Sequence, residues 1–162
     1  MPLIPDGWWI DEERRPELRD VLLAAYRELG QREDPPRSNR GPRIDVYTGL
    51  VGAPPSRPGF RWCVAFVRWC YTSSGFAFPR TWSVSELRDW AAANGHLVHG
   101  DVLPGDLFIV ERRVGGEEHH HTGLVVRARD TSRFDCIEGN HGDLVAATMR
   151  TSAEIDAFIR LA

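Results

Sequence analysis

At residues 104–111 the chain reads PGDLFIVE, and at this point its apolar pattern changes from helical to β. Before this stretch the apolar residues recur at helical spacing. After it they form short runs that are separated by Gly, Asp and Asn turns. Helices that come first and antiparallel strands that come second are typical of an α+β fold. The sequence therefore predicts N-terminal helices packed on a C-terminal antiparallel sheet.

The expected elements are bounded by capping and turn residues. The first helix has Pro16 in its opening turn and stops at Gly30, and the last has Ser83 and Glu86 at capping-box spacing. The expected helices are 16–29, 44–51, 62–73 and 83–94, and the expected strands are 106–111, 122–128, 133–138, 144–149 and 158–161. The Pro/Gly-rich stretches between these elements are short enough to be internal loops.

Size and composition indicate one globular domain over residues 1–162. A chain of 162 residues with 42% hydrophobic and 27% charged residues can build one ordinary core. A net charge of -3 and a pI near 6.1 argue against binding to nucleic acid, which favours basic proteins. The sequence has no apolar run of membrane-spanning length and no basic, apolar leader at residues 1–10. We expect a monomer that is made in the cytoplasm.

Three cysteines are too few, and odd in number, for a disulfide scaffold. Cys63 and Cys70 are seven residues apart, so on one helix they would be separated by roughly 10 Å, which is beyond disulfide reach. We expect reduced thiols, with Cys70 and Cys136 buried in the core.

Cys63 is the candidate nucleophile, because it follows the Pro58-Gly59 turn and begins a helix, where unpaired N–H groups favour a thiolate. His121 opens a predicted strand from which its imidazole can reach the helix start. Glu138 and Asn140 end the next strand, and regular alternation would point both to one side, where either can orient the imidazole. By spacing alone, an α+β domain without catalytic chemistry remains an alternative.

Several neighbouring residues have simpler interpretations. His119 and His120 are expected to be exposed loop residues, because consecutive histidines in an extended segment point opposite ways and rarely bind one ion. His141 is expected to be a solvated turn residue. Trp62, next to the candidate nucleophile, is expected to shape the substrate cleft. We expect no metal.

Four segments in this order resemble the CHAP family, the cysteine- and histidine-dependent amidohydrolases/peptidases. The first is RWCVAFVRWC at 61–70, which resembles a Trp-Cys-Ala-Ala-Phe-Val segment, and the second is PGDL at 104–107, which resembles a Pro-Gly-Asp turn. The others are HTGLV at 121–125, similar to a His-Val-Gly-Ile-Val strand, and IEGN at 137–140, similar to Glu-Gly-Asn. SNRGP at 38–42 also resembles a loop in bacterial and phage members. The similarity covers about residues 16–161.

The resemblance implies a papain-like fold, with Cys63 as nucleophile, His121 as general base and Glu138 as orienting group, assisted by Asn140. Family members typically cut amide bonds in peptidoglycan, either between glycan and stem peptide or within the peptide. The implied function is therefore a peptidoglycan amidohydrolase or endopeptidase that needs no cofactor. Delivery to the wall would require phage lysis or a secretion system. The acidic calcium loop of some members is missing, so no bound calcium is expected.

Two other functions remain open. One is a cysteine peptidase that acts on proteins, either as an effector or toxin or as a processing enzyme. The other is a cell-wall binding module that has lost turnover. The fold by itself does not separate these functions.

Overall fold

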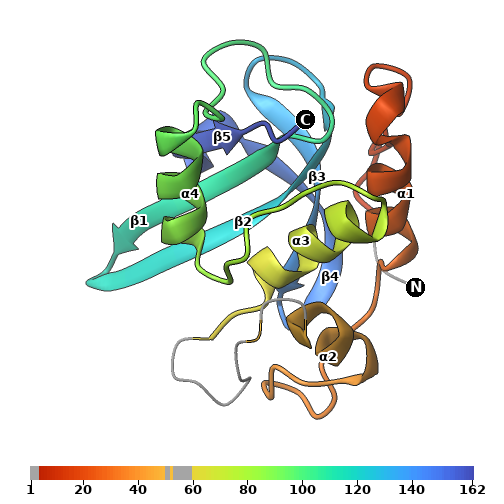
Figure 1. Cartoon of the computed structure of the whole chain (residues 1–162), viewed down its shortest axis with the longest axis vertical. Helices are drawn as coiled ribbons and strands as arrows, with labels where there is room; N and C mark the ends of the chain where they lie inside the picture. Colours follow the sequence, from red (N-terminus) through yellow and green to blue (C-terminus); the bar gives the residue numbers. More distant parts are fainter. Residues whose placement is uncertain (1–3, 50–51, 53–59) are drawn as a thin grey trace.

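The computed structural model describes residues 4–49, 52 and 60–162, and its helices precede its strands, which confirms the α+β class (Figure 1). The helical elements are the 3₁₀ turn η1 (Pro16–Leu18), α1 (Arg19–Arg27), α2 (Pro42–Gly49), α3 (Cys63–Ser73) and α4 (Val84–Ala93). The strands are β1 (Leu107–Val114), β2 (Glu117–Ala128), β3 (Arg133–His141), β4 (Leu144–Thr151) and β5 (Ala157–Ile159), with the 3₁₀ turn η2 (Ser152–Glu154) before β5. The turn expected at Pro58 and Gly59 lies outside the described residues.

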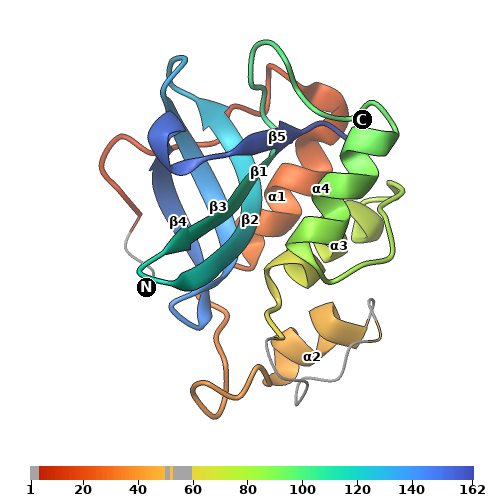
Figure 2. The same cartoon turned by 90° about the vertical axis from the view of Figure 1, so that its left-hand side faces the viewer.

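The strands form one antiparallel sheet in the order β4-β3-β2-β1-β5. Helices α1, α3 and α4 lie against one face of it, as Figure 2 shows. Helix α3 contacts β2 and β3, while α4 contacts β1, β2 and β5. The main core fills the space between helices and sheet, and a smaller cluster around Phe108, Phe134 and Cys136 covers part of the opposite face.

The β1–β2 hairpin is longer than the sequence predicts. Val114 pairs with Glu117 across a turn in which Gly115 and Gly116 both have positive φ, at 60° and 86°. Such a two-residue turn fixes the register of both strands. The polar residues next to the turn therefore pair across the two strands, although their side chains do not face a core. The expected loop at residues 112–120 is therefore wrong, because a polar hairpin end has no apolar alternation by which to recognise it.

Helix α4 begins as predicted, but only half of the expected capping box forms. The Ser83 hydroxyl accepts a hydrogen bond from the N–H of Glu86. The Glu86 carboxylate accepts a hydrogen bond from the Thr81 hydroxyl, and that hydroxyl in turn accepts one from the N–H of Ser83. The helix start is thus fixed through Thr81, which places Ser83 and Ser85 beside the β1–β2 hairpin.

All three cysteines are buried and free in the structure. Within residues 4–49, 52 and 60–162, none of the helices has the length and apolar character required to cross a membrane. The buried thiols at Cys70 and Cys136 belong to the two separate core clusters, one on each face of the sheet.

Candidate active site

Cys63 is the first residue of α3 and lines a cavity of about 370 Å³. The cavity is bounded by Arg61, Cys63, Trp82, Ser83, Val84, Ser85, Glu118 and His120. These residues come from the starts of α3 and α4 and from the β1–β2 hairpin. A helix start presents unpaired N–H groups, which stabilise a negative charge placed there. The cavity leaves room for a ligand to bind beside Cys63.

Trp62 holds the start of α3 in place and does not line this cavity. Its side chain has no exposed surface, its indole N–H donates to Oε1 of the buried Glu33 at 2.8 Å, and its ring stacks on Tyr47. The other carboxylate oxygen of Glu33 accepts a hydrogen bond from the N–H of Asn39 at 3.0 Å. The expected contribution to the cleft is therefore indirect, through the position of the neighbouring Cys63. No local sequence signal identifies Glu33 as the hydrogen-bond partner of Trp62.

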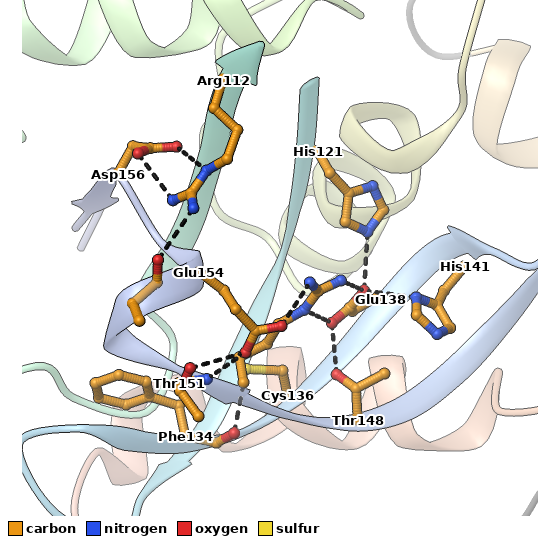
Figure 3. Close-up of polar contacts among 12 residues, drawn as sticks. Arg112, His121, Phe134, Cys136, Glu138, His141, Thr148, Thr151, Glu154 and Asp156 are labelled. Carbon is orange, nitrogen blue, oxygen red and sulfur yellow. Dashed lines mark hydrogen bonds and ion pairs between the residues drawn. The ribbon is translucent and has the colours of Figure 1, made fainter. Parts of the chain in front are cut away.

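His121 on β2 connects the thiol to a carboxylate on β3. Its Nε2 lies 2.9 Å from Oε2 of Glu138 (Figure 3), and the imidazole also hydrogen-bonds with the Cys63 side chain. Because Nε2 faces Glu138, Nδ1 is the nitrogen that is left to face the thiol. The fold thus brings together three of the predicted site residues, from α3, β2 and β3.

The protonation states follow from these contacts. Burial by itself lowers the pKa of His121, but the hydrogen bonds with Cys63 and Glu138 outweigh it and raise this pKa to about 9. Burial raises the pKa of Glu138, but hydrogen bonds from Arg150, His121 and His141 lower it well below its usual range. At neutral pH the imidazole is therefore an imidazolium beside an ionised carboxylate. The Cys63 side chain lies on the other side of this imidazolium.

Two residues of β4 that sequence reasoning missed hold Glu138 in place. Arg150 donates from Nε to Oε1 and from Nη2 to Oε2, both at 2.7 Å, and the Thr148 hydroxyl donates to Oε1. Residues 148 and 150 alternate along the strand and so share one face. A signal did exist, because a carboxylate buried in a sheet requires a cation, but the sequence does not say which arginine supplies it.

The strand end at Asn140 is irregular, so the expected alternation of Glu138 and Asn140 does not hold. Asn140 has φ 59°, and the β3–β4 register shifts between Glu138 and His141. Its side chain makes no hydrogen bond within the described part of the chain. His141, expected in a solvated turn, instead ends β3 with Nδ1 at 3.2 Å from Oε2 of Glu138.

The other two histidines of the triplet lie in β2, not in a loop. His120 lines the cavity, where its Nδ1 is 3.0 Å from the Ser85 hydroxyl and its Nε2 is 3.3 Å from Oε2 of Glu118. The Ser85 hydroxyl donates to Glu111. The expectation that His120 is a free loop residue is therefore wrong, because strand pairing turns it toward α4 while His119 stays exposed.

An α+β fold that directs a helix-start cysteine, an imidazole and a buried carboxylate toward one another has the residues of a cysteine-dependent hydrolase. The family model of the CHAP domain matches residues 55–140, which is more than half of the chain, and the protein belongs to the CHAP family. This family implies amidase or peptidase activity in general. No curated protein shows a significant match to the chain.

Proposed function

We propose that the protein is a peptidoglycan amidohydrolase or endopeptidase in which Cys63 is the nucleophile. The observation that carries this proposal is the chain of contacts from Cys63 to His121 and on to the buried Glu138. In this proposal the Glu138 carboxylate favours the imidazolium form of His121. That imidazolium in turn favours the thiolate form of Cys63. The substrate class comes from CHAP family membership, and the cavity beside Cys63 gives a peptide room to bind.

In the proposed reaction the Cys63 thiolate attacks an amide carbonyl carbon and forms a tetrahedral intermediate. The backbone N–H of Cys63, at the helix start, donates a hydrogen bond to the oxyanion. His121 gives its Nδ1 proton to the leaving amine as the carbon–nitrogen bond breaks, which leaves a thioester on Cys63. The neutral imidazole then takes a proton from water, and the resulting hydroxide attacks the thioester. Carboxylate product and thiolate are released, and the imidazolium is restored.

Glu138 and its partners hold the His121 ring in the orientation that each step of this reaction requires. Glu138 fixes the ring orientation through Nε2 and stabilises the imidazolium, so Nδ1 stays directed at the thiol. Asn140, two residues beyond Glu138, is proposed to assist it, although the Asn140 side chain makes no hydrogen bond to the imidazole within the described residues. Arg150 and Thr148 act only through Glu138, so we regard both as positioning residues.

Digestion of purified peptidoglycan sacculi tests the substrate. We expect the protein to release fragments with new amino and carboxyl ends and without new reducing sugar ends, and the Cys63→Ala variant to release none. New reducing ends would indicate glycosidase chemistry and would contradict the mechanism. If walls of several chemotypes stay intact while a denatured protein substrate is cut, the function is that of a protein-directed cysteine peptidase. Binding to sacculi without any cleavage would identify a binding module.

Alkylation tests the nucleophile separately from the substrate. Burial raises the pKa values of the Cys70 and Cys136 thiols well above the ordinary value, so these thiols stay protonated and slow to react. Brief treatment of the native protein with iodoacetamide near pH 6 should label Cys63 first and abolish hydrolysis in step. The His121→Ala variant should be labelled more slowly at Cys63. Faster labelling of Cys70 or Cys136 would contradict the assignment.

A further inference from the structure

Two histidine nitrogens converge on one oxygen of the buried carboxylate. Nε2 of His121 and Nδ1 of His141 lie 2.9 and 3.2 Å from Oε2 of Glu138. The three candidate ligand atoms all lie within 4.8 Å of one another, and the two ring centroids are 6.5 Å apart. In Figure 3 the two imidazoles approach Glu138 from different sides and leave its oxygen between them.

Two imidazole nitrogens and a carboxylate oxygen are a ligand set that suits zinc. Zinc takes four ligands at roughly 2.0–2.2 Å in a tetrahedral arrangement, so neighbouring ligand atoms lie about 3.4 Å apart. The two nitrogen–oxygen distances need to increase by only a few tenths of an ångström to reach that value. Calcium and magnesium prefer oxygen ligands and fit this set poorly. The fourth position would be left to water.

The surroundings of the three residues also match a metal site. The Glu138 carboxylate is held by Arg150 and Thr148, as outer partners hold a metal-binding carboxylate. His141 is half-exposed and His121 is partly exposed, so an ion can enter from solvent. The guanidinium of Arg150 opposes a second cation and weakens the affinity. We therefore expect zinc to bind to this site reversibly and not permanently.

We propose that His121, Glu138 and His141 form a zinc-binding site whose occupation inhibits the enzyme. Zinc displaces the Nε2 proton of the His121 imidazolium, which is released to solvent, and binds that nitrogen, so the ring keeps only the proton on Nδ1. It then no longer alternates between imidazole and imidazolium, as both proton transfers require. The inhibition rests on the proposed catalytic role of His121, whereas the binding does not.

Titration with zinc chloride in a calorimeter tests the binding directly. The starting variant is Cys63→Ala, because it removes the thiol as a competing ligand and leaves the three proposed ligands intact. We compare it with two double variants that add His141→Gln or His119→Gln. His119 is an exposed histidine on β2 outside the cluster, so its replacement is the matched control. Calcium chloride is the control ion, and circular dichroism checks that each variant is folded.

We expect one zinc ion per chain in the Cys63→Ala protein and in the His119→Gln control, and affinity at least about tenfold lower with His141→Gln. Undiminished zinc binding with His141→Gln, or no binding once Cys63 is removed, would overturn the proposal. In the catalytically intact protein, zinc should inhibit hydrolysis, and His141→Gln should raise the inhibitory concentration by a similar factor. If no substrate is found, the calorimetric result still decides the binding.

Discussion

Glu138 is ionised although its side chain has no exposed surface. A carboxylate removed from water costs several kcal/mol unless partners replace its hydration. Here the bidentate Arg150, the Thr148 hydroxyl and two imidazoles supply those partners. The energetic requirement of one buried charge thus accounts for most of the polar residues around the proposed catalytic base.

The first prediction compares Glu138 with Asn140. Glu138→Gln keeps a hydrogen-bonding group beside His121 but removes the charge that stabilises its imidazolium. We expect kcat to fall by at least roughly a hundredfold, since changing the acidic member of a triad costs up to ~10⁴-fold. Asn140→Gly tolerates the positive φ of this position and should cost much less. Steady-state kinetics on one substrate decide the order, and the reverse order would give the orienting role to Asn140.

The second prediction concerns the alkaline limb of the pH–rate profile. The pKa of His121 is raised to about 9, so its imidazolium is present at neutral pH and is lost as the pH rises through about 9. We therefore expect activity to decline above pH 9. The stabilisation from this ion pair follows the same sign: it is complete below about 6.5 and disappears as the pH passes through about 9. Glu138→Gln should move the limb to lower pH, and an unmoved limb would contradict the coupling.

The third prediction concerns Arg150. Arg150→Met leaves a buried carboxylate without its bidentate partner, which costs about 3–5 kcal/mol of unfolding free energy. Arg150→Lys keeps the charge but not the fork, so it should restore stability more than activity. If Arg150 acts as a positioning residue, Arg150→Met should lower kcat by roughly tenfold, or about 1.4 kcal/mol, and leave KM unchanged. Chemical denaturation and kinetics measure both quantities.

The matched control for Arg150 is Arg112, which makes an exposed bidentate pair with Asp156 on the surface of the sheet. Arg112→Met should change the unfolding free energy by less than about 1 kcal/mol, as is usual for exposed pairs. A similar loss of activity in both variants would show that Arg150 acts through general stability and not through Glu138.

At the scale of elements, the site depends on how closely α3 approaches β3. An ideal Cβ on Gly139 would lie 2.5 Å from Cβ of Phe66, so only glycine allows this contact. Gly139 follows Glu138 directly, whereas Phe66 lies one turn beyond Cys63. The contact therefore sets the separation of the helix that carries the thiol from the strand that carries the carboxylate.

The fourth prediction follows from this contact. Gly139→Ala should lower the unfolding free energy by about 1–3 kcal/mol, since overpacking a filled core forces the backbone apart. Gly100→Ala is the control, because no atom lies within 4 Å of its ideal Cβ and its φ is not positive. Denaturant titration compares the two variants. Equal stabilities would mean that α3 and β3 adjust without cost, and the close approach would then not position the site.

At the scale of the whole molecule, the sheet carries one hydrophobic core on each face within residues 4–49, 52 and 60–162. Cys70 belongs to the core under the helices and Cys136 to the cluster on the opposite face. Both clusters include side chains of β1 and β2, the central strands, so loss of one removes support from the other. The single-domain prediction therefore requires that both cores unfold as one unit.

The fifth prediction uses these buried thiols as site-specific probes. With increasing denaturant, Cys70 and Cys136 should become accessible to a brief alkylation pulse at the same midpoint, read by mass spectrometry. Far-UV circular dichroism should give that midpoint too. Separate midpoints for the two thiols would contradict the single-domain prediction and would identify the core that opens first.

The sequence by itself determined the α+β class, the order of the elements and the residues at the three corners of the proposed site. Local patterns carry this information, because apolar spacing and caps specify each helix and strand, and short motifs mark Cys63, His121 and Glu138. Only the tertiary structure showed that Arg150 and His141 contact Glu138 and that Glu33 holds Trp62. It also showed the irregular strand end at Asn140 and the approach of His120 to Ser85.

The physical reason is that such contacts join residues that are remote in sequence or separated by a break in strand regularity. A buried carboxylate needs a compensating cation, but the chain has 20 arginines and no lysine, and no local pattern selects one of these arginines. The choice depends on strand register, and a single irregular residue such as Asn140 changes which side chain faces the carboxylate.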